Sequence, residues 1–400
     1  MWNVVQTICA FNAGRDPERL AMKYKKMRAS PFMFLRGTCH LFYARLPNEP
    51  LFRRAPRVWS CGDLHLENFG SYKGDNRLVY FDINDFDEAA LAPATWDLVR
   101  LLSSVLVAAD TLHATQAQAL RLCKTFTQAY IDALTSGKAR WVERETAEGL
   151  VGQLLESLKA RSRVEFLDRR TDCKRRHRTI RCDGRHALSV SERQRADATD
   201  LINEFASEQP HCAFFKVLDV ARRIAGTGSL GVERYAVLVE GKGSPDGNYL
   251  LDLKQALPSS LQPGATGQPP WPSQAHRVVA LQRRMQAASM AFLHPILKEE
   301  RSYILRGLQP SEDRVTLDAS NSELAQIEGV LQEMGRILAW DQLRSSGRQG
   351  SVIADELIDF GARSSKWQQD LYEAAQQCAK QVMTDWQTYA GAYDAGALPA

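Results

Sequence analysis

The stretch from Cys61 to Ala89 constrains this chain more than any other feature of its sequence. It reads C-G-D-L-H-L-E-N-F-G, and after a short gap the apolar run L-V-Y-F-D-I leads into N-D-F-D-E-A. The apolar run predicts a buried strand that delivers Asp85 at its end, beside a loop that carries Asp63 and Asn68. Phosphoryl transfer uses one carboxylate that accepts a proton, together with a carboxylate and an amide oxygen that hold Mg²⁺. We therefore expect Asp63, Asn68 and Asp85 to form one site.

A second informative stretch lies far downstream, at 221–241, and contains Gly226, Gly228 and Gly231 in the spacing G-x-G-x-x-G. In a dinucleotide-binding fold the third glycine opens a helix, whereas here a β-branched and aromatic run follows and predicts a strand. The pattern favours a glycine-rich hairpin whose backbone N–H groups can lie over phosphates, as in kinases. The next predicted strand carries Lys254 among apolar residues, where a kinase keeps its phosphate-binding lysine. A surface lysine on an edge strand is the alternative.

The motifs of the first stretch are similar to the catalytic and metal-binding loops of the protein-kinase-like superfamily, especially aminoglycoside and choline phosphotransferases. Over nearly its full length the chain resembles DUF2252, an uncharacterised bacterial family of kinase-like proteins, through S-P-F-M-F-L-R-G, G-D-L-H-L-E-N-F-G, N-D-F-D-E-A and W-D-L-V-R-L. The resemblance implies that Asp63 is the catalytic base and that Asn68 and Asp85 are magnesium ligands. It also implies that Asp97 is a buried helix residue that braces the catalytic loop.

The order of these motifs differs from that of an ordinary kinase, in which the glycine loop and the lysine precede the catalytic loop. A circular permutation accounts for the order, because the same contacts can be buried from either chain order. We therefore expect an α+β, protein-kinase-like, two-lobed fold that is circularly permuted. Residues 1–200 would form the catalytic-loop part of the helical lobe, with a basic hairpin near 161–190. Residues 201–310 would form the nucleotide-covering lobe, and residues 311–400, with a long helix at 323–344, would complete the large lobe.

Composition fits a single soluble enzyme of 400 residues, since 44% of the residues are hydrophobic and 24% are charged. No apolar run is long enough to span a membrane. The N-terminus has neither a basic n-region nor a clean apolar h-region, so the cytoplasm is the expected location. Eight cysteines without C-x-x-C pairs indicate reduced thiols, several of them in the core, rather than a disulfide framework.

The substrate side of the chain points to a small molecule. Only ten residues separate Asp85 from Trp96, which leaves no room for a long activation loop or a peptide-docking platform. The segment 161–185 is rich in Arg and Lys, and Asp183-Gly184 predicts the turn of a basic hairpin that would favour an anionic acceptor. Nucleic acid is disfavoured because aromatic residues do not interleave these charges and the whole chain has a net charge of only +4. Zinc binding by C-x3-H-x4-C-x3-H in this segment is disfavoured by its spacing.

Two departures from the kinase pattern bear on activity. Cys61 stands where catalytic loops of the superfamily usually have His, and the helix expected at 276–292 contains no Glu to pair with Lys254. Gln282 or Gln286 would have to hydrogen-bond that lysine instead. Polar neighbours of the catalytic motifs, among them Asp87, Glu88 and His65, are expected to be solvated or hydrogen-bonded supports.

The sequence therefore predicts an ATP- and magnesium-dependent phosphotransferase with a small or anionic acceptor. Two alternatives stay open: a nucleotide-binding pseudokinase with a regulatory role, and a kinase-fold nucleotidyl (AMP) transferase. Because a protein that only binds nucleotide needs no base, Asp63 favours an enzyme over the pseudokinase. Phosphoryl and nucleotidyl transfer use the same metal ligands, so the sequence leaves the choice between them open, and it leaves the oligomeric state open as well.

Overall fold

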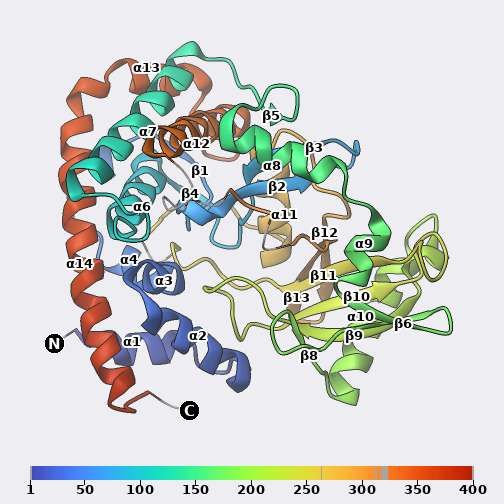
Figure 1. Cartoon of the computed structure of the whole chain (residues 1–400). Coiled ribbons are helices and arrows are strands. Elements are labelled where there is room, and N and C mark those ends of the chain that lie inside the picture. Colours follow the sequence, from blue (N-terminus) through green and yellow to red (C-terminus); the bar gives the residue numbers. More distant parts are fainter. Residues whose placement is uncertain (1, 263, 311–312, 316, 318–322, 399–400) are drawn as a thin grey trace.

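The computed structural model describes residues 2–262, 264–310, 313–315, 317 and 323–398. Helices and strands are both abundant, in a helix-rich part and a part built around an antiparallel sheet (Figure 1). The expected α+β class is therefore confirmed. The division expected at residue 201 falls inside α10 (Glu192–Ser207), and the one expected at 311 falls on residues outside the described part of the chain.

Four long helices form the core of the helix-rich part. α6 (Ala94–Val107) is buried along its whole length and packs against α7 (Gln116–Ser136) and α14 (Gln368–Asp394), while α12 (Leu324–Ser345) packs along α7. Each helix has apolar residues at helical spacing and so presents a stripe that its neighbours must cover. The helices expected at 96–107, 114–134 and 323–344 are confirmed to within two residues at each end. The shorter helices of this part include α1 (Val4–Phe11), α5 (Pro50–Arg54), α8 (Gly149–Lys159) and α13 (Ala354–Ala362), whereas α9 (Arg163–Asp168) packs Leu167 against the antiparallel sheet of the other part.

The N-terminal segment 16–46, expected to be mostly helical, forms α2 (Pro17–Ala29), α3 (Pro31–Gly37) and α4 (Cys39–Ala44). Pro31 begins α3, as expected, and the Ser30 hydroxyl caps it by accepting a hydrogen bond from the Met33 N–H. Proline fits the first turn of a helix because the N–H that it lacks has no partner there.

Two small sheets hold the loop 61–68 and the segment 84–89 near α6; the sequence predicts these two segments to be the catalytic motifs. β1 (Arg57–Ser60) pairs with β4 (Ala90–Pro93), and β2 (Phe69–Lys73) pairs with β3 (Val79–Ile83), which also pairs with β5 (Val142–Glu143). The strand expected at 78–83 is therefore confirmed. The loop 61–68 follows β1 and the segment 84–89 follows β3, and the Asn84 N–H donates to the Asn68 carbonyl at 2.9 Å. The two motifs consequently lie side by side.

A six-stranded antiparallel sheet forms the second part of the molecule, in the order β12-β13-β11-β10-β9-β8. Its glycine-rich stretch is the connection between β9 and β10, and β11 carries Lys254, so the hairpin and the strand expected there are confirmed. The bounds are β8 (Ala187–Leu188), β9 (Val217–Arg223), β10 (Arg234–Val239), β11 (Tyr249–Gln255), β12 (His294–Lys298) and β13 (Arg301–Gly307).

Alternation along the strands separates the two faces of this sheet. Tyr235, Val237 and Val239 of β10 pack with α10 in one apolar cluster, whereas Ala236 and Leu238 pack in another on the opposite face. Successive side chains of a strand point to opposite faces, so Arg234 must share the face of Ala236. The same alternation places Asp252 and Lys254 of β11 opposite the α10 face, because Leu251 and Leu253 belong to the α10 cluster.

The basic hairpin forms, but its turn lies elsewhere than expected. β6 (Thr171–Lys174) pairs with β7 (His177–Ile180), and the turn residues are Arg175 and Arg176, with φ of +48° and +66°. The turn predicted at Asp183-Gly184 is wrong as a hairpin turn, since that segment connects β7 to β8. Two arginines give no turn signal in a sequence, because residues other than glycine rarely adopt positive φ.

The helix expected at 276–292 is also partly wrong. α11 (Gln274–Met285) begins near the expected residue and ends seven residues early, and Phe292 has a φ of +62°. Its apolar and polar residues continue the helical pattern past Met285, but the chain must turn there to reach β12 and the edge of the sheet.

None of the helices in the described residues is long and apolar enough to cross a membrane. All eight cysteines lie in the described part of the chain and are free thiols; Cys39, Cys61, Cys123 and Cys378 are buried. The expectation of reduced, partly core-packed cysteines is therefore confirmed.

Two glycines of α12 allow a direct test of the α7–α12 contact. A Cβ on Gly335 would collide with the Phe126 carbonyl of α7, whereas a Cβ on Gly329 would meet nothing. Gly335→Ala should lower the free energy of unfolding by about 1 to 3 kcal/mol through overpacking. Gly329→Ala should raise it by roughly 0.5 to 1 kcal/mol, because alanine restricts the unfolded chain. Urea denaturation of both variants checks the contact, and equal shifts would contradict it.

Candidate functional site

A cavity of about 430 Å³ lies between the catalytic motifs of the helix-rich part and the six-stranded sheet. Asp63, Asn68 and Asp85 line it from one side. Gly226, Gly228 and Lys254 line it as well, although they are far away in sequence. The structure therefore brings six of the seven expected site residues together. The seventh, Gly231, lies outside the lining and packs against Arg15 and Asp16.

The backbone of the catalytic loop is fixed by Asp97 of α6. One Asp97 carboxylate oxygen accepts a hydrogen bond from the Cys61 N–H and the other from the Gly62 N–H, each at 3.1 Å. Gly62 has a φ of +84°, and a Cβ there would collide with the Glu88 carbonyl, so the turn requires glycine. The bracing role that the resemblance implied for Asp97 is confirmed.

Asp63 is paired with a buried arginine of α6. Its Oδ1 accepts hydrogen bonds from Arg100 Nη2 at 2.6 Å and from Arg100 Nε at 3.2 Å. Burial raises the pKa of the Asp63 carboxyl above its ordinary value, and the Arg100 guanidinium opposes that rise. Within the described residues Oδ2 accepts no hydrogen bond, so this oxygen is available to a ligand.

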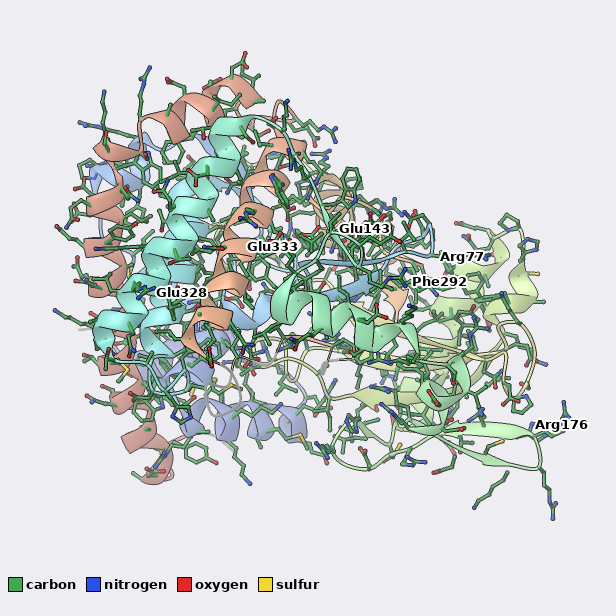
Figure 2. All side chains as sticks on the ribbon, turned by 45° about the horizontal axis from the view of Figure 1, so that its top comes forward. Arg77, Glu143, Arg176, Phe292, Glu328 and Glu333 are labelled. Atoms are coloured by element: carbon green, nitrogen blue, oxygen red, sulfur yellow. The ribbon has the colours of Figure 1, made fainter. Side chains whose placement is uncertain are left out.

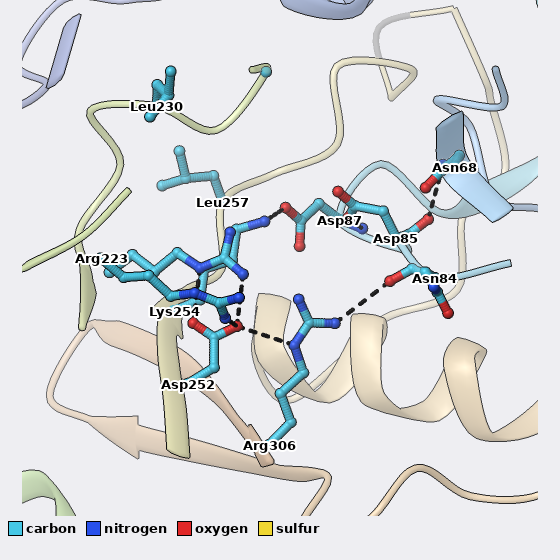
Figure 3. Close-up of polar contacts among 12 residues, drawn as sticks. Asn68, Asn84, Asp85, Asp87, Arg223, Leu230, Asp252, Lys254, Leu257 and Arg306 are labelled. Carbon is cyan, nitrogen blue, oxygen red and sulfur yellow. Dashed lines mark hydrogen bonds and ion pairs between the residues drawn. The ribbon is translucent and has the colours of Figure 1, made fainter. Parts of the chain in front are cut away.

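Asn68 joins the two catalytic motifs through its amide group. Its Nδ2 donates to the Asp63 carbonyl at 2.9 Å. It donates more weakly to the Asp85 carbonyl, at 3.5 Å (Figure 3). The amide nitrogen is thereby turned toward the protein, which leaves Oδ1 as the ligand-facing atom. Sequence reasoning placed Asn68 here through its five-residue spacing from Asp63.

Asp85 and Asn68 fit a magnesium ion by the chemistry of their donors. Both offer oxygen atoms, and although burial acts to raise the pKa of Asp85, Lys254 and Arg306 together lower it below its ordinary value. No group of three or more His, Cys, Asp and Glu side chains in the described ranges is arranged to hold a metal ion. Mg²⁺ does not require such a group, because it commonly binds one or two carboxylates and completes its shell with water and phosphate oxygens. Asp82, on the same strand, instead lies 3.7 Å from Arg344 and outside the cavity.

Lys254 has a partner that the sequence reasoning passed over. Its Nζ forms an ion pair with the Asp87 carboxylate, two residues after Asp85 (Figure 3). The expectation that Gln282 or Gln286 would pair with this lysine is wrong, since Gln282 donates to Gln286, which donates to the Ile83 carbonyl at 2.7 Å. The motif D-F-D-E-A could have indicated this partner, because its second acid, Asp87, also follows the end of a strand. Asp87 is therefore a site residue rather than a solvated support.

His65 and Glu88, the other two expected supports, are hydrogen-bonded within the protein. The His65 Nδ1 accepts from the Glu67 N–H at 3.1 Å, and Glu88 accepts from both the N–H and the hydroxyl of Ser260. Both side chains also line the cavity, so their supporting role places them close to any ligand.

The glycine loop closes over the catalytic loop. A Cβ on Gly228 would lie 3.1 Å from the Arg36 carbonyl and 3.9 Å from Asp63 Oδ2. The Gly228 carbonyl accepts hydrogen bonds from Arg15 and from the buried Lys23, which hold the loop from outside. Within the described residues, the backbone N–H groups of 225–229 donate to no acceptor. Residues 225–229 line the cavity together with Asp63 and Asp85, and a run of N–H groups without a protein acceptor is suited to phosphate oxygens.

The structure adds cations to the cleft that sequence reasoning missed. Arg36 and Arg314 both pair with Glu67, at 2.6 and 2.7 Å, on the side of Asp63. A second group on the sheet side consists of Arg223, Arg234 and Arg306 around Asp252 (Figure 3). All of these arginines line the cavity. The alternating patterns R-Y-A-V-L-V and L-L-D-L-K-Q could have indicated the second group, because they put charges on one face of a strand.

The basic hairpin contributes no side chain to the cavity. No residue of 161–185 lines the cavity, and Arg176 lies at the outer tip of the β6–β7 hairpin (Figure 2). Arg178 is buried and pairs with Asp168 at 2.6 Å and with Asp246 at 3.1 Å, which is a structural role. The expectation that this hairpin brings its cations to the cavity is therefore wrong; Arg36 and Arg314 line the cavity instead.

Comparison with known proteins gives one match. A family model described as an uncharacterized protein conserved in bacteria (DUF2252) matches residues 15–392. No curated protein and no solved structure matches the chain.

Replacing Asp97 tests the bracing of the catalytic loop. Asp97→Asn keeps the shape of the side chain but points an amide N–H₂ at one of the two backbone donors. Stability should fall by about 1 to 3 kcal/mol, because a buried donor loses its acceptor. Urea denaturation measures this change, with the exposed Asp110→Asn after α6 as a matched control that should stay within roughly 0.5 kcal/mol of wild type. Equal stability of both variants would show that the loop does not depend on Asp97.

Proposed function

The chain belongs to the DUF2252 family, and from this premise and the geometry of the cleft we propose that it is an ATP- and magnesium-dependent phosphotransferase for a small or anionic acceptor. The observation that carries the proposal is the shared cavity: Asp63, Asn68 and Asp85 meet the glycine loop and Lys254 across it. Packing of a protein core does not require acids, a lysine and unpaired N–H groups in one cavity. Binding of a magnesium-bound polyphosphate requires this combination.

Asp63 would act as the base. Its Oδ2 is available to the acceptor hydroxyl, while Arg100 and the Asn68 amide hold the rest of the residue in place. As the acceptor oxygen forms its bond to the terminal phosphorus of ATP, the bond from that phosphorus to the bridging oxygen breaks and ADP leaves. The hydroxyl proton passes to Asp63.

The remaining residues would bind and orient the nucleotide. Asp85 and the Asn68 amide oxygen would hold Mg²⁺, which neutralises charge on the transferred group. Lys254 would exchange Asp87 for a phosphate oxygen, and the N–H groups of 225–229 would cover the phosphates. Most of the catalytic effect in such a site comes from positioning and charge stabilisation rather than from covalent chemistry.

The nature of the acceptor follows from the other end of the cavity. Between Asp85 and α6 the chain forms only the short strand β4, which pairs with β1 and leaves no platform for a peptide. Arg36 and Arg314 stand beside Glu67 near Asp63, where an anionic group of the acceptor could replace Glu67 as their partner. A small or anionic acceptor fits this volume and charge.

A two-lobed, circularly permuted kinase-like fold is part of the proposal. The glycine-loop hairpin, the lysine strand β11, α11 and β12–β13 come in the order of a kinase's nucleotide-covering lobe, and α12 follows them. The catalytic loop then comes from the N-terminal region, where an ordinary kinase would continue from its long helix. The permuted order supports the proposal because these elements follow one another as a permuted kinase requires, although Asp87 and not a Glu of α11 pairs with Lys254.

Incubation of the pure protein with Mg²⁺, a metabolite extract and ATP labelled at either the α- or the γ-phosphate tests the function. Transfer of the γ-label supports phosphotransfer, and transfer of the α-label indicates an AMP transferase. Nucleotide binding with neither label transferred indicates a pseudokinase.

Two carboxamide variants should separate binding from chemistry. Asp85→Asn should weaken magnesium-dependent ATP binding about tenfold or more, because it removes a charged metal ligand. Asp63→Asn should bind ATP with nearly wild-type affinity yet lose transfer. Calorimetry with and without Mg²⁺ measures the first effect, and the labelled assay measures the second. Wild-type affinity in Asp85→Asn would contradict the metal assignment.

The pH dependence of transfer should report on Asp63. Its raised pKa places the acid limb of the rate profile above the ordinary range of Asp, since the base must be ionised. Arg100 favours the ionised form, so Arg100→Gln should raise the pKa further and move the limb to higher pH. Profiles of kcat/KM for wild type, Arg100→Gln and the exposed control Arg121→Gln check this. A limb that stays in place or moves to lower pH in Arg100→Gln would rule out Asp63 as the base.

A further inference from the structure

A cluster of arginines around one carboxylate occupies the sheet side of the cleft. Asp252 of β11 is fully buried, with Arg234 of β10, Arg306 of β13 and Arg223 of β9 within 3.2 Å of its carboxylate (Figure 3). The arginines line the cavity, whereas Asp252 lies behind them. None of these residues was needed to place the base or the metal ligands.

Strand register explains why these charges gather. Arg306 stands directly opposite Asp252 on the neighbouring strand, and Arg234 stands directly opposite Lys254. Directly paired residues of antiparallel strands point to the same face, which here is the cleft face. A pair of cations in register, such as Arg234 and Lys254, repels unless an anion lies between or above them.

The cluster carries more positive charge than its own carboxylate can balance. Arg234 binds Asp252 through two hydrogen bonds, of 2.8 and 2.6 Å, and one guanidinium in this fork geometry neutralises one carboxylate. Arg223 and Arg306 are then two further cations. Burial alone would raise the pKa of Asp252, but Arg223 and Arg234 hold it well below its usual range, so it stays ionised and contributes only one negative charge.

Arg223 and Arg306 have N–H donors that their hydrogen bonds within the protein do not use. Arg306 donates to Asp252 at a long 3.2 Å and to the Asn84 carbonyl at 3.5 Å. Arg223 Nη1 is buried and makes no well-directed hydrogen bond, although it lies 2.8 Å from Asp252. Arg223 Nη2 donates to the Gln309 carbonyl, and Arg306, which is partly exposed, also interacts with Asp85 and lowers its pKa. The remaining donors and positive charge in this partly buried cleft favour an anion that completes them.

We propose that Arg223 and Arg306, held in place by Asp252 and Arg234, form a binding site for a phosphate group, separate from the magnesium ligands. The phosphate comes either from the nucleotide or from a phosphorylated acceptor. The site deepens the proposed function and rests on it only for the nature of the ligand. An aromatic base in this position would leave the arginines without partners, so the cluster selects an anion there. Arginine suits this role because its planar fork matches two phosphate oxygens at once.

Calorimetric titration with inorganic pyrophosphate in the absence of Mg²⁺ tests the site. Wild type should bind, and Arg306→Gln and Arg223→Gln should each bind roughly tenfold more weakly, the loss of one charge-assisted hydrogen-bonding partner. Asp85→Asn should bind pyrophosphate at least as tightly as wild type, because it removes a negative charge that interacts with Arg306. Arg195→Gln is the matched control: Arg195 pairs with Asp219 of β9 at 2.5 Å, is half exposed and lies outside the cavity.

The outcomes separate the two sources of phosphate. If ATP displaces pyrophosphate from wild type, the nucleotide occupies the cluster; if both bind together, the cluster takes the phosphate of another molecule. No pyrophosphate binding by wild type, or an equal loss in Arg195→Gln, overturns the site. Should the glutamine variants fail to fold, Arg306→Lys keeps the charge but lacks the fork and should bind pyrophosphate more weakly than wild type; unchanged affinity with the fold intact would contradict a site built on the guanidinium group.

Failure of this site and failure of the proposed function give different results. Pyrophosphate binding without any transfer from labelled ATP would leave the anion site standing and remove the phosphotransferase. Intact transfer, with unchanged pyrophosphate affinity in the glutamine variants, would support the phosphotransferase and remove the anion site.

Discussion

The hold of Asp97 on the catalytic loop is the interaction on which the rest of the site depends. The carboxylate of the fully buried Asp97 accepts hydrogen bonds from the backbone N–H groups of Cys61 and Gly62, and so fixes the turn from β1 into the loop. That turn sets where Asp63 lies relative to Arg100, one helical turn further along α6. Asp97 and Arg100 belong to one helix. The loop is therefore positioned together with the arginine that lowers the pKa of Asp63.

Charge pairs stabilise the ligand-free site both within each side of the cleft and, between Lys254 and Asp87, across it. Lys254 holds Asp87, Arg36 and Arg314 hold Glu67, and Arg234 holds Asp252. Each pair satisfies a side chain that would otherwise be buried with unpaired charge. Under the proposed function a polyanionic ligand would take over Lys254, Arg36 and Arg314 from Asp87 and Glu67, whereas the fully buried Asp252 would keep its arginines in place. The pairs therefore keep the cleft stable and leave it able to bind.

Most of the catalytic motif was predictable because its contacts are local. Asp63, Asn68 and Asp85 lie within one loop and the following strand end, so spacing and strand pattern suffice to bring them together. Gly226, Gly228 and Lys254 were predictable as a hairpin and a strand for the same reason. Asp87 was missed because its partner stands 167 residues away, and no local pattern separates a paired acid from a solvated one. The Arg175-Arg176 turn was missed because its sequence carries no glycine or asparagine.

The sequence by itself determined the α+β class and the main helices and strands, and it placed Asp63, Asn68 and Asp85 in one loop and at the following strand end. Those features follow from short-range rules of periodicity, capping and backbone conformation. Only the tertiary structure decided that the glycine loop covers Asp63, that Gly231 stays outside, that the basic hairpin points away and that Arg223, Arg234 and Arg306 share Asp252. Each of these depends on how distant segments pack against one another. Strand register and the match between apolar faces determine that packing, and the spacing of residues along the chain does not reveal it.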